Sequence, residues 1–188
     1  MIRSWSSRVR ELVPVTTVAL DHEVDLAACW LPDREFVEDG FTDNRDYVPL
    51  GTLDWARVRE VAALEHEVFE EIARDAADSD AFEDRLSDLE YDNVPVWDLE
   101  SIELGVASCV FALNAAGCAT AFSCRGHGGL GYPQVTLAGE RATVETLLQE
   151  ARSAACGMTS DGEGLVWLYA PSMLEMCSFA DLLVARFE

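Results

Sequence analysis

The sequence predicts an α+β protein, with an antiparallel or mixed sheet, helices packed on one face of that sheet, and an acidic helical N-terminal half. Its 188 residues are 49% apolar, which is enough to bury a core. Residues 53–90 carry apolar side chains at helical spacing, whereas residues 99–188 alternate helical stretches with short runs typical of strands. We therefore expect one continuous globular unit made of an acidic subdomain, residues 1–98, and an α+β subdomain, residues 99–188.

The chain before position 53 is expected to form a strand and then an acidic loop. Residues 14–20 are rich in valine and threonine, which favours a strand. Proline and glycine breakers recur through residues 32–52, which predicts the loop. Its aspartates Asp39, Asp43 and Asp46 miss the alternating spacing of an EF-hand calcium loop, so no calcium site is predicted there.

Two helices are expected next. From position 53 to about position 77, apolar residues recur at steps of three and four, which predicts an amphipathic helix that Thr52 or Asp54 can cap. A shorter helix is expected over residues 79–90, and its outward face is acidic.

The second half shows an alternation of helices and strands. The apolar periodicity, the glycine and proline positions and the β-branched runs predict seven elements. These are a helix over 100–116, strands over 118–124 and 133–138, a helix over 141–154, strands over 155–159 and 165–170, and a helix over 172–186.

The net charge is −22, and all 13 basic residues are arginines. Residues 1–100 hold 26 of the 35 acidic residues, so the acidity is concentrated in the first half. Such a surface repels phosphate backbones, and we therefore exclude DNA or RNA as a direct ligand. Two explanations for the acidity stay open: the coding bias of a GC-rich or salt-adapted genome, and a functional acidic surface.

The chain has no run of about 18 apolar residues and no apolar segment at its N-terminus, so we expect a cytoplasmic protein with no membrane partner. The six cysteines are expected to be reduced thiols. Cys109 and Cys177 fall on apolar helical stripes, which predicts that they fill the core. The tryptophans at positions 55, 97 and 167 also fall on apolar patterns and are expected in the core.

The loop after the strand over 118–124 is the candidate site. It places a thiol, a guanidinium and an imidazole between glycines, whose conformational freedom exposes backbone N–H groups to an anion. Cys124 is the candidate nucleophile and His127 the candidate general acid or base. The candidate ligand-binding residues for an anionic group are Thr120, Ser123, Arg125, Gly126 and Gly128.

Two other interpretations of this loop remain open. Cys124 and His127 can be half of a zinc site completed by Cys118, Cys156 or His22, although no second ligand pair at short spacing is present and no metal is predicted. Alternatively, the strand simply ends here, its arginine pairs with one of the many acids, and the glycines shape a turn. The residues do not identify a cofactor.

The region of residues 100–140 carries a recognisable pattern. It consists of Leu113-Asn114, Gly117, Thr120 and Ser123-Cys124-Arg125-Gly126-His127, followed by Tyr132-Pro133 and a strand. This pattern resembles uncharacterised bacterial and phage proteins with a Ser-Cys-x-Gly-His motif. It is more distantly similar to the wybutosine-synthesis methyltransferase family, which has Ser-Cys-Ser-Gly-Arg after a comparable helix and strand. Here Arg125 replaces that family's second serine and His127 its arginine.

Two classes of function follow. In the first, the protein is a small-ligand-binding protein or enzyme with an anion-binding site at the loop 123–129. In the second, it is an acidic interaction protein of the immunity or inhibitor type, which includes mimics of nucleic acid, and it blocks a basic partner such as a nuclease toxin.

Overall fold

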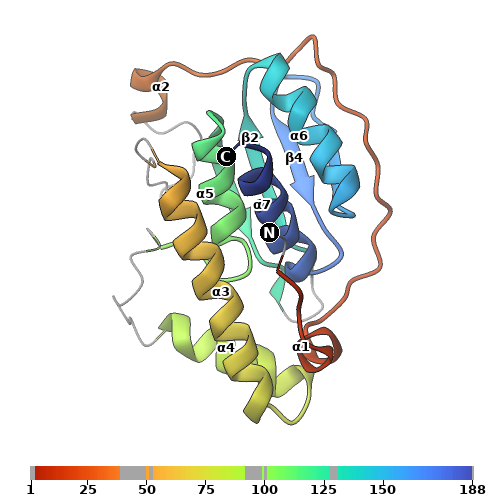
Figure 1. Cartoon of the computed structure of the whole chain (residues 1–188). Coiled ribbons are helices and arrows are strands. Elements are labelled where there is room, and N and C mark those ends of the chain that lie inside the picture. Colours follow the sequence, from red (N-terminus) through yellow and green to blue (C-terminus); the bar gives the residue numbers. More distant parts are fainter. Residues whose placement is uncertain are drawn as a thin grey trace.

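The computed structural model describes residues 3–38, 50, 53–91, 99, 101–127 and 131–187. Within them, four antiparallel strands form one sheet in the order β1-β2-β4-β3, and helices α5, α6 and α7 cover one of its faces (Figure 1). The strands are β1 (Ala119–Cys124), β2 (Gln134–Ala138), β3 (Gly157–Ser160) and β4 (Val166–Tyr169). The helices are α5 (Ala107–Ala115), α6 (Arg141–Ser153) and α7 (Met173–Phe187). The predicted α+β class is confirmed.

The register of the sheet separates a buried face from an open one. Val135 pairs with Leu168, and both are completely buried beneath the helices. On the opposite face, Thr136 lies between Phe122 and Trp167, whose side chains are 46% and 47% exposed. The expectation that Trp167 is a core residue is wrong, because alternate residues of a strand point to opposite faces and its neighbours take the buried one. Trp97 lies outside the described residues.

The two long helices of the acidic half pack against the helical layer. Helix α3 (Trp55–Asp75) contacts α5 and α7, and α4 (Ser79–Tyr91) folds back against α3. The Asp54 carboxylate accepts a hydrogen bond from Arg57 N at 2.8 Å, which confirms one of the two predicted caps, while Thr52 lies outside the described residues. A second hydrophobic cluster joins α1 (Ser7–Leu12), α3, α4 and α7.

The predicted strand over 14–20 is wrong, since these residues form no ladder in the sheet. The chain runs extended past them and pairs later, where Met158 N donates to Asp21 O at 2.8 Å and Ser160 N to Glu23 O at 3.2 Å. Residue numbers rise together in these two bonds, so this segment runs parallel to the edge strand β3.

Two short helices were not predicted, α1 and α2 (Arg34–Glu38). Each begins with a side-chain cap, because Ser6 accepts from Val9 N and Asp33 accepts from Phe36 N. Helix α2 lies inside the stretch predicted as an acidic loop. The predicted absence of calcium concerns Asp39, Asp43 and Asp46, which lie outside the described residues.

The helix predicted over 100–116 begins only at Ala107. Residues 104–106 form a turn, and Gly105 adopts φ +95°, where a Cβ would collide with the Met173 side chain. The buried Glu65 carboxylate caps this helix by accepting hydrogen bonds from Gly105 N and Ala107 N. The late start leaves Glu103 in the connection before α5, where it faces the end of β1.

In the part of the chain that the structure describes, every helix is too short or too polar to cross a membrane.

Candidate functional site

The site lies where β1 ends, and a sharp turn after this strand shapes it. Cys124, the last residue of β1, pairs with Gln134 of β2. Two residues later, Gly126 adopts φ +78°, and a Cβ there would lie 2.6 Å from the backbone carbon of Tyr132. Only glycine fits this position. The turn brings His127 back toward the connection that precedes α5.

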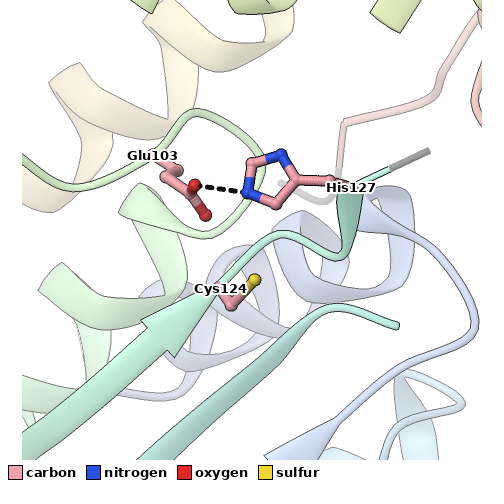
Figure 2. A group of neighbouring side chains, drawn as sticks. All are labelled: Glu103, Cys124 and His127. Atoms are coloured by element: carbon pink, nitrogen blue, oxygen red, sulfur yellow. Dashed lines mark ion pairs between the residues drawn. The ribbon is translucent and has the colours of Figure 1, made fainter. Parts of the chain in front are cut away.

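Three metal-ligating side chains meet at this turn: Glu103, Cys124 and His127 (Figure 2). One ligand atom from each lies within 4.8 Å of the other two, and among the described residues this is the only such group of three. His127 Nε2 lies 2.8 Å from Glu103 Oε1. The His127 side chain is 54% exposed and that of Glu103 28% exposed, so solvent reaches the cluster.

Backbone N–H groups of the turn support two of these side chains. Arg125 N donates to Glu103 Oε2 at 2.8 Å, which fixes the carboxylate and leaves Oε1 toward His127. Gly126 N donates to Cys124 Sγ at 3.4 Å. Both backbone donors were expected to bind an external anion. The anion that the turn holds in the structure is the chain's own Glu103.

The Arg125 side chain points away from this cluster into the protein. It is 1% exposed, its Nη2 donates to Ser87 Oγ at 2.8 Å, and its Nε lies 3.8 Å from Glu83 Oε2. Ser87 and Glu83 both belong to α4, so the guanidinium fastens the turn to that helix. This arrangement matches the alternative interpretation, in which the arginine pairs with an acid of the same chain.

The other predicted ligand-binding residues are distributed along β1 and beyond. Thr120 is buried, and its Oγ1 accepts a hydrogen bond from Asn114 Nδ2 at 2.9 Å, which ties β1 to α5. Ser123 is half-buried opposite Val135. Gly128 lies outside the described residues. The structure thus brings the two candidate catalytic residues, Cys124 and His127, together and adds Glu103 to them.

The residues considered as further zinc ligands lie elsewhere. Cys118 is buried just before β1, and burial raises the pKa of its thiol to about 12. Cys156 is buried as well, with its pKa raised by burial, and His22 Nε2 lies 3.0 Å from Cys156 O. A buried thiol with a raised pKa is a poor source of the thiolate that a metal needs.

Glu103 was not identified as a site residue from the sequence. The expected helix over 100–116 placed it in a first helical turn, among residues of no special interest. One signal was present: Glu103 is the last acidic residue before a stretch, residues 104–139, that contains none. It is therefore the acid nearest to the loop on that side in the chain.

The orientation of the imidazole distinguishes two kinds of chemistry. In a thiol–imidazole–carboxylate relay, the thiol and the carboxylate contact different ring nitrogens. Figure 2 shows the ring nitrogen that pairs with Glu103 on the side of Cys124, while the second ring nitrogen points away from both. Sulfur, nitrogen and oxygen donors that converge in this way are suited to a shared cation.

Comparisons with known proteins add no assignment: no family model, no curated protein and no solved structure matches this chain. The resemblance of residues 100–140 to Ser-Cys-x-Gly-His proteins and to the wybutosine-synthesis methyltransferases stays a prediction.

Proposed function

We propose that this protein is a small-ligand-binding protein or enzyme whose site is a divalent transition-metal centre, held by Glu103, Cys124 and His127. The observation that carries the proposal is the convergence of three donors within 4.8 Å of one another, with a backbone donor behind both the carboxylate and the thiol. Zinc is the best match, because it accepts exactly this mixture of sulfur, nitrogen and oxygen ligands.

A metal would require the oxygen and nitrogen donors to move slightly apart. Nitrogen and oxygen ligands of a tetrahedral zinc lie about 3.3 Å apart, given bond lengths of about 2.0–2.1 Å. Glu103 Oε1 and His127 Nε2 are 2.8 Å apart and must therefore separate by about half an ångström. His127 is half exposed and has room to turn. A solvent-accessible ion pair of this kind is worth no more than about 1 kcal/mol, so it opposes metal entry only weakly.

Three protein ligands leave one position of a tetrahedral zinc for water or a small ligand. The sequence predicts that an anionic ligand binds to the backbone of the loop. With a metal present, the anion would bind to the metal instead. A metal-bound water is also a stronger acid than free water, which is how such a centre would supply a nucleophile near neutral pH.

Cobalt titration of the reduced, chelator-treated protein tests the proposal. Co²⁺ bound through a thiolate gives a sulfur-to-metal charge-transfer band, which we expect at one equivalent and which zinc should displace. Cys124→Ser should abolish the band, whereas Cys29→Ser, at another cysteine outside the core, should keep it. Loss of a residue that hydrogen-bonds to a metal ligand costs about 10–100-fold in metal affinity. His127 is a proposed ligand itself, so His127→Ala should weaken zinc binding more than roughly 100-fold.

Equal cobalt spectra for the wild type and Cys124→Ser would contradict the metal centre. The anion site predicted from the sequence gives a different outcome, namely metal-independent binding of inorganic phosphate that Arg125→Ala removes. Calorimetry with phosphate, in the presence and absence of zinc, therefore separates the two. We expect phosphate to bind only when zinc is present.

A further inference from the structure

A groove lies between α3 and α4, formed by residues that the metal cluster does not use. Its volume is about 300 Å³. The floor is apolar and the rim is charged. The floor consists of Val68, Ile72 and Ala76 at the α3 side and Ala81 and Leu89 of α4, and the rim of Glu71, Asp75 and Arg85.

The groove exists because the two helices touch along one side only. Phe69 of α3 meets Phe82 of α4 edge to face, with ring centroids 5.7 Å apart, and both rings are completely buried. On the other side of this contact line, the facing residues Ala76 and Ala81 are too small to fill the space. The ring pair thus holds the helices together, and the groove beside it has a floor in which Val68 and Ile72 are buried and Ala76, Ala81 and Leu89 are partly exposed.

The size and lining of the groove indicate the kind of ligand. About 300 Å³ is the lower end of the range for ligand pockets, so it holds a few side chains rather than a large cofactor. The floor offers no polar side chain to orient a small molecule. Recognition of an amphipathic helix uses such a groove, with apolar anchors spaced three or four residues apart.

The charge around the groove indicates which side chains the partner helix carries on its polar face. Solvent-exposed acids occur along both helices, on the rim and beside it, and they are Glu67, Glu71, Asp75, Asp78, Asp80, Asp84 and Asp88. Arg85 is the cation of the rim. A partner that carries arginine or lysine beside its apolar anchors complements this surface, whereas an acidic or neutral helix does not.

We infer that the α3–α4 groove docks a basic amphipathic helix of a partner protein, with its apolar side chains in the groove and its cations against the surrounding acids. The opposite side of α4 contacts Arg125 of the turn through Glu83 and Ser87. The groove is therefore separate from the cluster of Glu103, Cys124 and His127. This inference does not depend on the proposed function.

Binding of a synthetic peptide tests the inference. The probe is a labelled helical peptide with leucines at i, i+4 and i+7 and arginines on the remaining face; its control has the same composition with the leucines spread around the helix. We expect fluorescence anisotropy to show at least about tenfold tighter binding of the amphipathic peptide, because only this peptide aligns its anchors. Equal binding of both peptides would mean attraction by net charge alone and would overturn the inference.

Variants of the groove locate the binding. Ala81→Trp and, with a smaller added volume, Ala76→Leu fill the groove, and the pair Glu71→Lys with Asp75→Lys reverses the rim. Each of these changes should weaken binding of the amphipathic peptide about tenfold or more. Glu145→Lys, at an exposed acid of α6, should leave the binding unchanged. Backbone NMR shifts of the wild type give a readout that needs no variant. Shifts concentrated on α3 and α4 support the inference, and shifts concentrated elsewhere refute it.

Discussion

Two carboxylates of this protein accept hydrogen bonds from the backbone, one in the core and one at the surface. Glu65 of α3 and Glu103 before α5 each accept backbone N–H groups from a neighbouring segment, and each has a cysteine nearby. Glu65 is completely buried, while Glu103 stands at the surface. The difference between these two sites is whether solvent reaches the carboxylate.

At Glu65, every neighbour is part of the fold. Its oxygens accept hydrogen bonds from Gly105 N at 2.8 Å, Ala107 N at 3.0 Å and Ser108 N at 3.2 Å, and from Cys177 Sγ at 3.5 Å. The three N–H groups are donors that the start of a helix leaves without intrahelical partners. Burial raises the pKa of the Cys177 thiol well above its ordinary value, so this cysteine is a packed, unreactive side chain.

At Glu103, the backbone supplies one donor, Arg125 N, and the other oxygen faces a titratable, half-exposed imidazole. Cys124 lies beside this pair and is not fully buried. Solvent access is the decisive difference: the closed carboxylate–cysteine pair fastens α3 to α5, whereas solvent reaches the open one.

The largest effect is expected from Glu65→Ala. The change leaves three buried N–H groups without their acceptor, and each such group costs about 1–3 kcal/mol, so the free energy of unfolding should fall by roughly 3 kcal/mol or more. Urea denaturation followed by circular dichroism measures it. Glu67→Ala, at an exposed position of the same helix, is the control and should change stability by less than about 0.5 kcal/mol. Equal losses in both variants would contradict the capping role.

A smaller, pH-dependent effect is expected from Glu65→Gln. Burial raises the pKa of the Glu65 carboxyl above its ordinary value of 4.5. The folded protein then keeps a proton that the unfolded chain releases, so the wild type loses stability as the pH rises from about 4.5 to the folded-state pKa. Glutamine does not titrate there, so the stability of the wild type relative to Glu65→Gln should fall as the pH rises through this window. A difference that is constant with pH would contradict the raised pKa.

The smallest effect on stability is expected from His127→Ala. The side chain is 54% exposed and its ion pair with Glu103 is open to water, so the free energy of unfolding should change by no more than about 0.5 kcal/mol. Thermal unfolding of the metal-free protein measures it. In the presence of zinc, the wild type alone should gain stability through binding. A large loss of stability without metal would show that the open carboxylate is structural after all.

Several elements of the fold could be predicted from short stretches of sequence. Apolar residues that recur every three or four positions from position 53 identified α3. The alternation of helical and strand-like stretches in the second half identified the sheet and its helices. The strand that ends at Cys124 and the turn with Gly126 were also predicted, because turn chemistry depends on adjacent residues. The strand predicted over residues 14–20 is wrong because a strand needs a pairing partner, and the composition of a segment does not show whether one is available.

The sequence by itself determined that a thiol and an imidazole emerge together at a strand end, on a turn that only glycine permits. Tertiary structure decided what surrounds them. Glu103 reaches the turn across 22 residues and Ser87 reaches Arg125 across 38, so the arginine of the loop is a buried anchor and Glu103 joins Cys124 and His127 at the surface. The physical reason is range: periodicity and turn geometry are properties of neighbouring residues, whereas the partner of a charge is chosen by packing between distant segments.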